Sequence, residues 1–112
     1  MINSLADIGR RMSEYQLPAY MHGSVARYLC HGIRPGGFLT AVITNDLREA
    51  VSSADDENLT MLVSWVQWFY NEAPALSWGS EEAMDAWVSG EGRGPEASPA
   101  AFRSCLLDSA CD

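Results

Sequence analysis

Lysine is absent from the chain, and all seven of its basic residues are arginine. They stand against fifteen acidic residues, so the formal net charge is −8 at pH 7. This balance disfavours direct contact with the phosphate backbone of a nucleic acid. The imbalance is strongest from Glu49 to Glu91, where nine acidic residues occur and no basic one. An acidic surface of this kind either serves solvation or meets a basic groove on another protein.

Long hydrophobic runs are missing, and cysteine is scarce. No apolar run reaches the roughly 18 residues that a membrane span needs. Asp7 and Arg10 interrupt the segment where a signal peptide would lie. The three cysteines, Cys30, Cys105 and Cys111, form an odd and irregularly spaced set, which argues against a disulfide framework and for a reducing compartment. We therefore expect a cytoplasmic protein without membrane contact.

Sequence motifs of catalysis and of metal binding are absent as well. The chain holds no CxxC pair, no HExxH, no phosphate-binding glycine loop and no GxSxG. The positions of cysteine and histidine fit no compact zinc site. We predict a protein that is not an enzyme and that uses neither a cofactor nor a metal.

The apolar spacing predicts an all-α protein, a compact bundle of about five to six short helices. The main helices are expected at residues 3–16, 18–31, 37–54, 56–73 and 81–89. The connection between the third and the fourth is minimal, so residues 37–54 and 56–73 should form an antiparallel hairpin at the centre of the bundle. Residues 1–89 then make one helical domain, residues 90–98 a flexible linker, and residues 99–112 a short C-terminal helix or mobile tail.

The predicted helix at residues 56–73 is apolar on two sides. The face expected to pack against the core is formed by Leu59, Leu62, Val63, Val66, Phe69, Tyr70 and Ala73. A second stripe, Met61, Trp65 and Trp68, lies on the far side. A helix that is apolar nearly all round is either buried on several sides or presents one face to a partner. The second stripe is therefore core, a dimer interface or a partner surface.

Polar residues on the second and third predicted helices form a possible polar site. Tyr20, Arg27 and His31 follow one stripe of the second helix, and His22 lies on the same helix. Asp46 falls within the apolar arc of the third helix, where a carboxylate is costly unless it is paired or hydrogen-bonded. A structural ion pair or helix cap is the favoured role of Asp46, ahead of catalysis.

Five segments of the chain carry a family resemblance: LPAYMHG at 17–23, HGIRPGGFLTAV at 31–42, NDL at 45–47, YNEAP at 70–74 and WGS at 78–80. In these segments the chain resembles small, uncharacterised phage and prophage proteins of proteobacteria. The match covers about residues 17–88. The resemblance implies expression in the cytoplasm of a bacterial host, and small acidic phage proteins often bind and inhibit host machinery. It brings no activity, cofactor or catalytic residue with it.

These observations favour a phage or prophage accessory protein that binds and inhibits a host defence or nucleic-acid-processing protein. Aromatic anchors dominate many protein interfaces, so the predicted contact residues combine the aromatic stripe with nearby acids: Met61, Trp65, Trp68, Glu72, Asp55, Asp56 and Glu57. Two alternatives stay open. One is a small-ligand or catalytic module that uses Tyr20, His22, Arg27, His31 and Asp46, and the other is a phage regulator whose stripe closes a homodimer.

Overall fold

The computed structural model describes residues 5–89, and every regular element within them is a helix. The seven α-helices are α1 (Leu5–Glu14), α2 (His22–His31), α3 (Gly37–Ile43), α4 (Leu47–Ser53), α5 (Asp56–Thr60), α6 (Leu62–Glu72) and α7 (Glu81–Ser89). Two 3-10 helices, Ala19–Met21 and Ala75–Ser77, precede α2 and α7. The all-α prediction is confirmed, while the predicted linker 90–98 and C-terminal segment 99–112 lie outside the described residues.

The predicted helix at residues 37–54 is broken in two at Asn45. Asn45 has a φ of 65°, in the left-handed region, and the Asp46 N–H bonds to the Ala41 carbonyl at 2.8 Å. This pattern ends α3 in the way that a left-handed residue commonly ends a helix. Asp46 then begins α4, because its carboxylate accepts the Glu49 N–H at 3.1 Å. Two helices therefore replace the single one expected.

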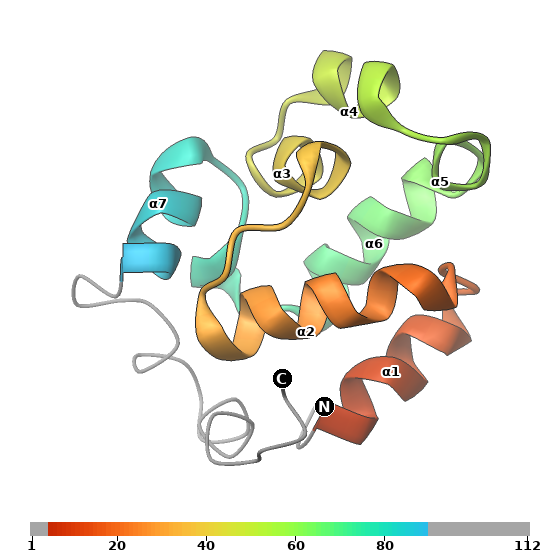
Figure 1. Cartoon of the computed structure of the whole chain (residues 1–112), viewed down its shortest axis with the longest axis horizontal. Helices are drawn as coiled ribbons and strands as arrows, with labels where there is room; N and C mark the ends of the chain where they lie inside the picture. Colours follow the sequence, from red (N-terminus) through yellow and green to blue (C-terminus); the bar gives the residue numbers. More distant parts are fainter. Residues whose placement is uncertain (1–4, 90–112) are drawn as a thin grey trace.

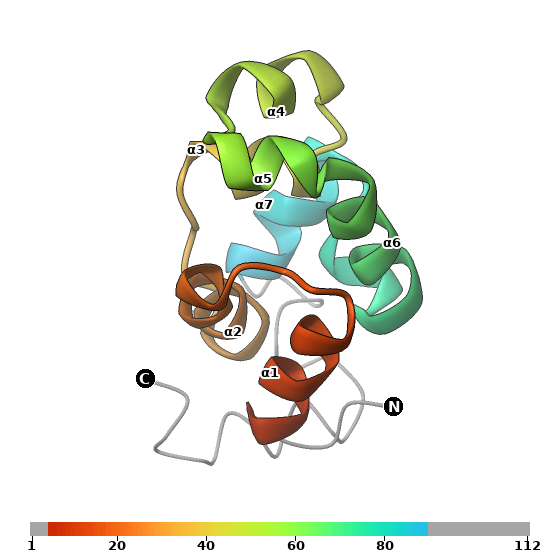
Figure 2. The same cartoon turned by 90° about the vertical axis from the view of Figure 1, so that its right-hand side faces the viewer.

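The predicted helix at residues 56–73 is broken as well, at Met61. Asp55 caps the start of α5 by accepting the Asn58 N–H at 2.7 Å. Met61, with φ −99° and ψ 15°, ends α5 and precedes α6. The two helices run in different directions from this point (Figure 2). The two long helices that the expected hairpin required are therefore replaced by four short ones.

The core is built around α6 and α2. α1 lies against α2, α3 packs on α4 and α6, and α7 packs on the 3-10 helix before it (Figure 1). The largest side chains that are fully buried come from α6, α7 and α2: Trp65, Trp68, Trp87, Tyr28 and Phe69. Aromatic residues supply large apolar areas, so this cluster accounts for much of the burial that holds seven short helices together.

Two hydrogen bonds fasten α7 and the segment before it to α2. The Tyr28 hydroxyl donates to the Ser77 carbonyl at 2.6 Å, and the Trp87 indole N–H donates to the Tyr28 carbonyl at 3.0 Å. Gly32 ends α2 with a φ of 67°. A Cβ added there would lie 3.2 Å from the Trp87 carbonyl oxygen. The close approach of α2 and α7 therefore requires a glycine at this position.

Cys30 lies on α2, is buried, and is disulfide-bonded. The cysteine count argued against a framework of several disulfides, and one bonded cysteine is not such a framework. Cys105 and Cys111 lie outside the described residues. Disulfides are uncommon in a reducing cytoplasm, so the cytoplasmic location stays a prediction. Across residues 5–89, no helix has both the length and the apolar character that a membrane crossing needs.

Candidate functional site

The tryptophans of the predicted contact stripe are core residues. Trp65 and Trp68 are both 0% exposed, and Met61 is half-buried and packed against the core. The expectation that these tryptophans form a partner surface is wrong. Burying an indole removes more apolar area from water than burying a valine, so the fold turns the tryptophan side of α6 inward.

Trp65 is held by a polar contact as well as by packing. Its indole N–H donates to the Asn58 side-chain oxygen at 3.0 Å, and Asn58 itself is only 3% exposed. The Phe38 ring meets the indole edge-on at a centroid distance of 5.9 Å. These contacts fix α5 relative to α6 and α3, and they give Trp65 a structural role.

The opposite side of α6, expected to pack in the core, faces water instead. Val63 is 70% exposed and Tyr70 is 76% exposed, and Val66 is also exposed. Their spacing of three and four residues places them on one side of the helix. Leu59, at the end of α5, is exposed too. Of the face predicted to be buried, Phe69 alone is fully enclosed.

This apolar surface continues from α6 onto α4. Leu47 and Val51 are exposed and lie four residues apart on α4. Leu47 and Val66 both line a hollow of about 40 Å³ between α4 and α6, which joins the two helices into one surface. We call the exposed set, Leu47, Val51, Leu59, Val63, Val66 and Tyr70, the apolar face. It is the candidate functional site.

The acidic residues predicted to contact a partner divide into two kinds. Glu72 pairs with Arg11 of α1 at 3.6 Å and accepts from the hydroxyl of Tyr15, which follows α1, at 3.1 Å. Asp55 caps α5 and also accepts a hydrogen bond from Tyr20. These two carboxylates therefore serve the fold. Asp56 and Glu57 are exposed and contribute negative charge to the surface.

Most of the apolar face lies in an acidic stretch of the sequence. From Glu49 to Ser89 the sequence has eight acidic residues and no basic one, and this stretch includes α5, α6 and α7 entirely. Arg48, beside Leu47, is the basic residue closest to the face in sequence. An apolar surface with acidic residues nearby suits a partner whose contact surface is apolar at the centre and basic at the rim.

The predicted polar site does not come together. Asp46 caps α4, which confirms its favoured structural role, but it is exposed, so the expectation that it lies within an apolar arc is wrong. His22 Nε2 is 3.2 Å from the Leu17 carbonyl, Arg27 bonds to Ser24 of its own helix at 3.4 Å, and Tyr20 bonds to Asp55. His31, half-buried at the end of α2, also has a partner of its own. Tyr20, His22 and Arg27 therefore bond to three different partners and not to one another, so these side chains do not converge on one site.

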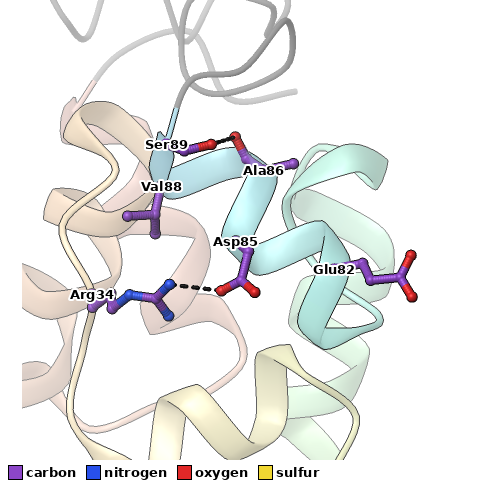
Figure 3. A pocket seen from close by; sticks show the side chains of 6 residues that line it. All are labelled: Arg34, Glu82, Asp85, Ala86, Val88 and Ser89. Carbon is purple, nitrogen blue, oxygen red and sulfur yellow. Dashed lines mark hydrogen bonds and ion pairs between the residues drawn. The ribbon is translucent and has the colours of Figure 1, made fainter.

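A more open pocket of about 430 Å³ lies beside α7 (Figure 3). Arg34 donates to Asp85 at 2.6 Å across it, and Glu82 points away from this pair. The two opposite charges satisfy each other, and both side chains are more than half exposed. Exposed ion pairs contribute little to stability. Because Arg34 is already paired with Asp85, it is not an unpaired charge that a ligand could bind.

Comparison of the chain with protein-family models, with curated proteins and with solved structures finds no match. The phage and prophage context therefore stays a prediction. Within residues 5–89, no cluster of three or more His, Cys, Asp or Glu side chains is arranged to hold a metal ion. The apolar face could not be located from the sequence, because both sides of α6 carry apolar residues at helical spacing.

Proposed function

We propose that the protein acts by binding another protein through its apolar face. The observation that carries the proposal is the exposure of Val63, Val66 and Tyr70 on a helix whose other side is fully buried. Folded proteins seldom leave a contiguous apolar patch in water unless it contacts something. The hollow lined by Leu47 and Val66 is a small depression in this surface, and a side chain of the partner could insert into it.

The partner that suits this face presents an apolar ridge flanked by arginine or lysine. The net charge of −8, with Asp56 and Glu57 exposed on the same helix as Leu59, would attract such a surface and speed its encounter with the protein. A second copy of the chain suits the face less well. Each copy carries a net charge of −8, so two acidic surfaces would repel each other on association.

In the phage or prophage context that the family resemblance implies, the partner is a protein of the bacterial host and binding inhibits it. Surfaces that contact nucleic acids are characteristically basic. An acidic protein that covers such a surface competes with the nucleic acid for it. This supports a host defence or nucleic-acid-processing protein as the partner class.

The test is affinity capture from a bacterial lysate with three tagged proteins: the natural chain, the double variant Val63→Glu/Tyr70→Glu, and a control with Ser13→Glu/Ala75→Glu. All four positions are exposed, and both variants add two negative charges. The face variant should lose the captured partner while its circular dichroism and melting stay unchanged, and the control should keep the partner. Capture of the same proteins by all three would contradict the proposal.

A further inference from the structure

A second hollow, of about 270 Å³, lies where α2, α3, α4 and α5 meet. None of its lining residues belongs to the apolar face. Met21, Phe38 and Leu39 supply an apolar wall, and polar groups from α2, α4 and α5 line the rest. A water molecule occupies about 30 Å³ in the liquid, so the space admits a ligand of several heavy atoms.

Asn58 contributes a nearly buried hydrogen-bond donor to this hollow. Its Oδ1 accepts the Trp65 indole N–H, and this fixes which end of the amide is the nitrogen. Among the described residues, none accepts a hydrogen bond from the Asn58 Nδ2. Asn58 is 3% exposed and lines the hollow, and its Nδ2 does not belong to the buried side-chain atoms that lack a partner, so water reaches this nitrogen. Its amide nitrogen is therefore positioned to donate to a ligand.

Asp55 places a negative charge on the same wall. Of the described residues that line the hollow, it is the one that carries a charge. Its two oxygens accept from the Asn58 N–H and from Tyr20, and an ionised carboxylate has about four acceptor sites in all. The Tyr20 hydrogen bond, followed by the Asn58 N–H, holds the pKa of Asp55 below its ordinary value. The ionised group keeps capacity for a cationic donor.

We propose that this hollow binds a small molecule with a primary ammonium group next to a carbonyl group. The ammonium would contact Asp55, the carbonyl oxygen would accept from the Asn58 Nδ2, and a short aliphatic group would lie against Phe38 and Leu39. A free amino acid and the amino end of a peptide share this chemistry. The site is independent of the apolar face, so either proposal can fail without the other.

The experiment is an NMR titration of the ¹⁵N-labelled protein with leucinamide, leucine and N-acetyl-leucinamide at millimolar concentrations. Leucinamide should shift the Asn58 side-chain amide signals saturably, and the acetylated compound, which lacks the positive charge, should not. Binding of both leucine and leucinamide would identify the natural ligand as a free amino acid. Binding of leucinamide alone would identify it as the amino end of a peptide. Absence of shifts with all three, or equal shifts with the acetylated compound, would overturn the proposal.

A charge-matched pair of variants tests the role of Asp55. Asp55→Asn removes the charge but keeps a good helix cap, so the fold is retained and leucinamide should bind about tenfold more weakly. Asp56→Asn makes the same change at an exposed neighbour that does not line the hollow. Its effect should stay below about twofold. An equal loss in both variants would show general electrostatic attraction and overturn the assigned site.

Discussion

Trp65 and Trp68 lie on one side of α6, and Val63, Val66 and Tyr70 lie on the other. Both sides are apolar, yet the first is fully enclosed and the second faces water. The difference follows side-chain size and polar contacts. The indoles remove the most area from water, and Trp65 also donates a hydrogen bond to the side-chain oxygen of the buried Asn58. A helix with two apolar sides thus buries the side that offers more area and leaves the other side in water.

The largest effect is expected when one residue on each side of α6 is truncated, which tests the assignment of one side to the core and of the other to the surface. Trp65→Ala should destabilise the protein by about 3–5 kcal/mol, because it removes a large buried side chain and leaves a cavity. Val66→Ala, on the exposed side, should change stability by no more than about 0.5 kcal/mol. Urea denaturation followed by circular dichroism measures both. Similar losses in the two variants would mean that the valine side is also part of the core.

A finer comparison separates the two tryptophans. Trp65 donates to Asn58, whereas no residue in the described part of the chain accepts a hydrogen bond from the buried Trp68 Nε1. Trp65→Phe leaves the Asn58 oxygen without its donor, at a cost of about 1–3 kcal/mol beyond the loss of volume. Trp68→Phe loses volume but removes an unpaired donor. Trp65→Phe should therefore be the less stable variant by about 1 kcal/mol or more in urea denaturation, and a reversed order would refute the assigned pairing.

The α4 part of the apolar face depends on its cap, since Ala50 is the residue of this helix that is buried. Asp46→Ala removes the acceptor for the Glu49 N–H and should cost about 1 kcal/mol. Asp46→Asn keeps an acceptor and should be nearly neutral. Hydrogen exchange at residues 47–53 reports the change locally. Equal effects of the two variants would indicate that charge matters at this position, as the ligand or catalytic alternative requires.

The smallest effect concerns the pH dependence set by Tyr20 and Asp55. Their hydrogen bond is the main cause that lowers the pKa of Asp55 from 3.8 and raises that of Tyr20 to about 12. The folded-state pKa of Asp55 lies below the unfolded one, so its stabilisation is present above pH 3.8 and lost as the pH falls through the folded-state value. The Tyr20 contribution is complete below pH 10 and lost as the pH rises through about 12.

Tyr20→Phe tests this assignment directly. Without the phenol hydroxyl, the pKa of Asp55 should rise towards its ordinary value, as measured by NMR titration of the carboxyl carbon. Asp56, exposed and next in sequence, provides the internal control and should titrate alike in both proteins. An Asp55 pKa that is unchanged by the substitution would show that Tyr20 does not set it.

The sequence predicted the features that depend on local chemistry. Gly32 ends α2 in the left-handed region, where glycine is the usual residue, and Ser80, a residue type that favours helix starts, caps α7 by accepting the Ala83 N–H at 3.0 Å. The buried positions of Met84 and Trp87 also follow from helical spacing. These outcomes need only a few neighbouring residues, so a short window of sequence contains the necessary information.

Two features were missed for different reasons. The break at Asn45 had a local signal, because asparagine tolerates the left-handed region and Asp46 is a good cap. The prediction of one continuous helix instead followed the apolar periodicity, which runs on through Asn45 and Asp46. The orientation of α6 had no local signal. It depends on contacts of Trp65 with Asn58 and Phe38, which exist only once the helices are assembled.

Site-specific photo-crosslinking in a bacterial host tests the binding role of the apolar face most directly. A photoreactive residue is placed at position 63 or 70 on the face, or at position 13 on α1 as the control. We predict one major product from positions 63 and 70, containing one copy of this chain and one other protein, and no such product from position 13. Products made of two copies of the chain, equal crosslinking from position 13, or none from positions 63 and 70 would contradict it.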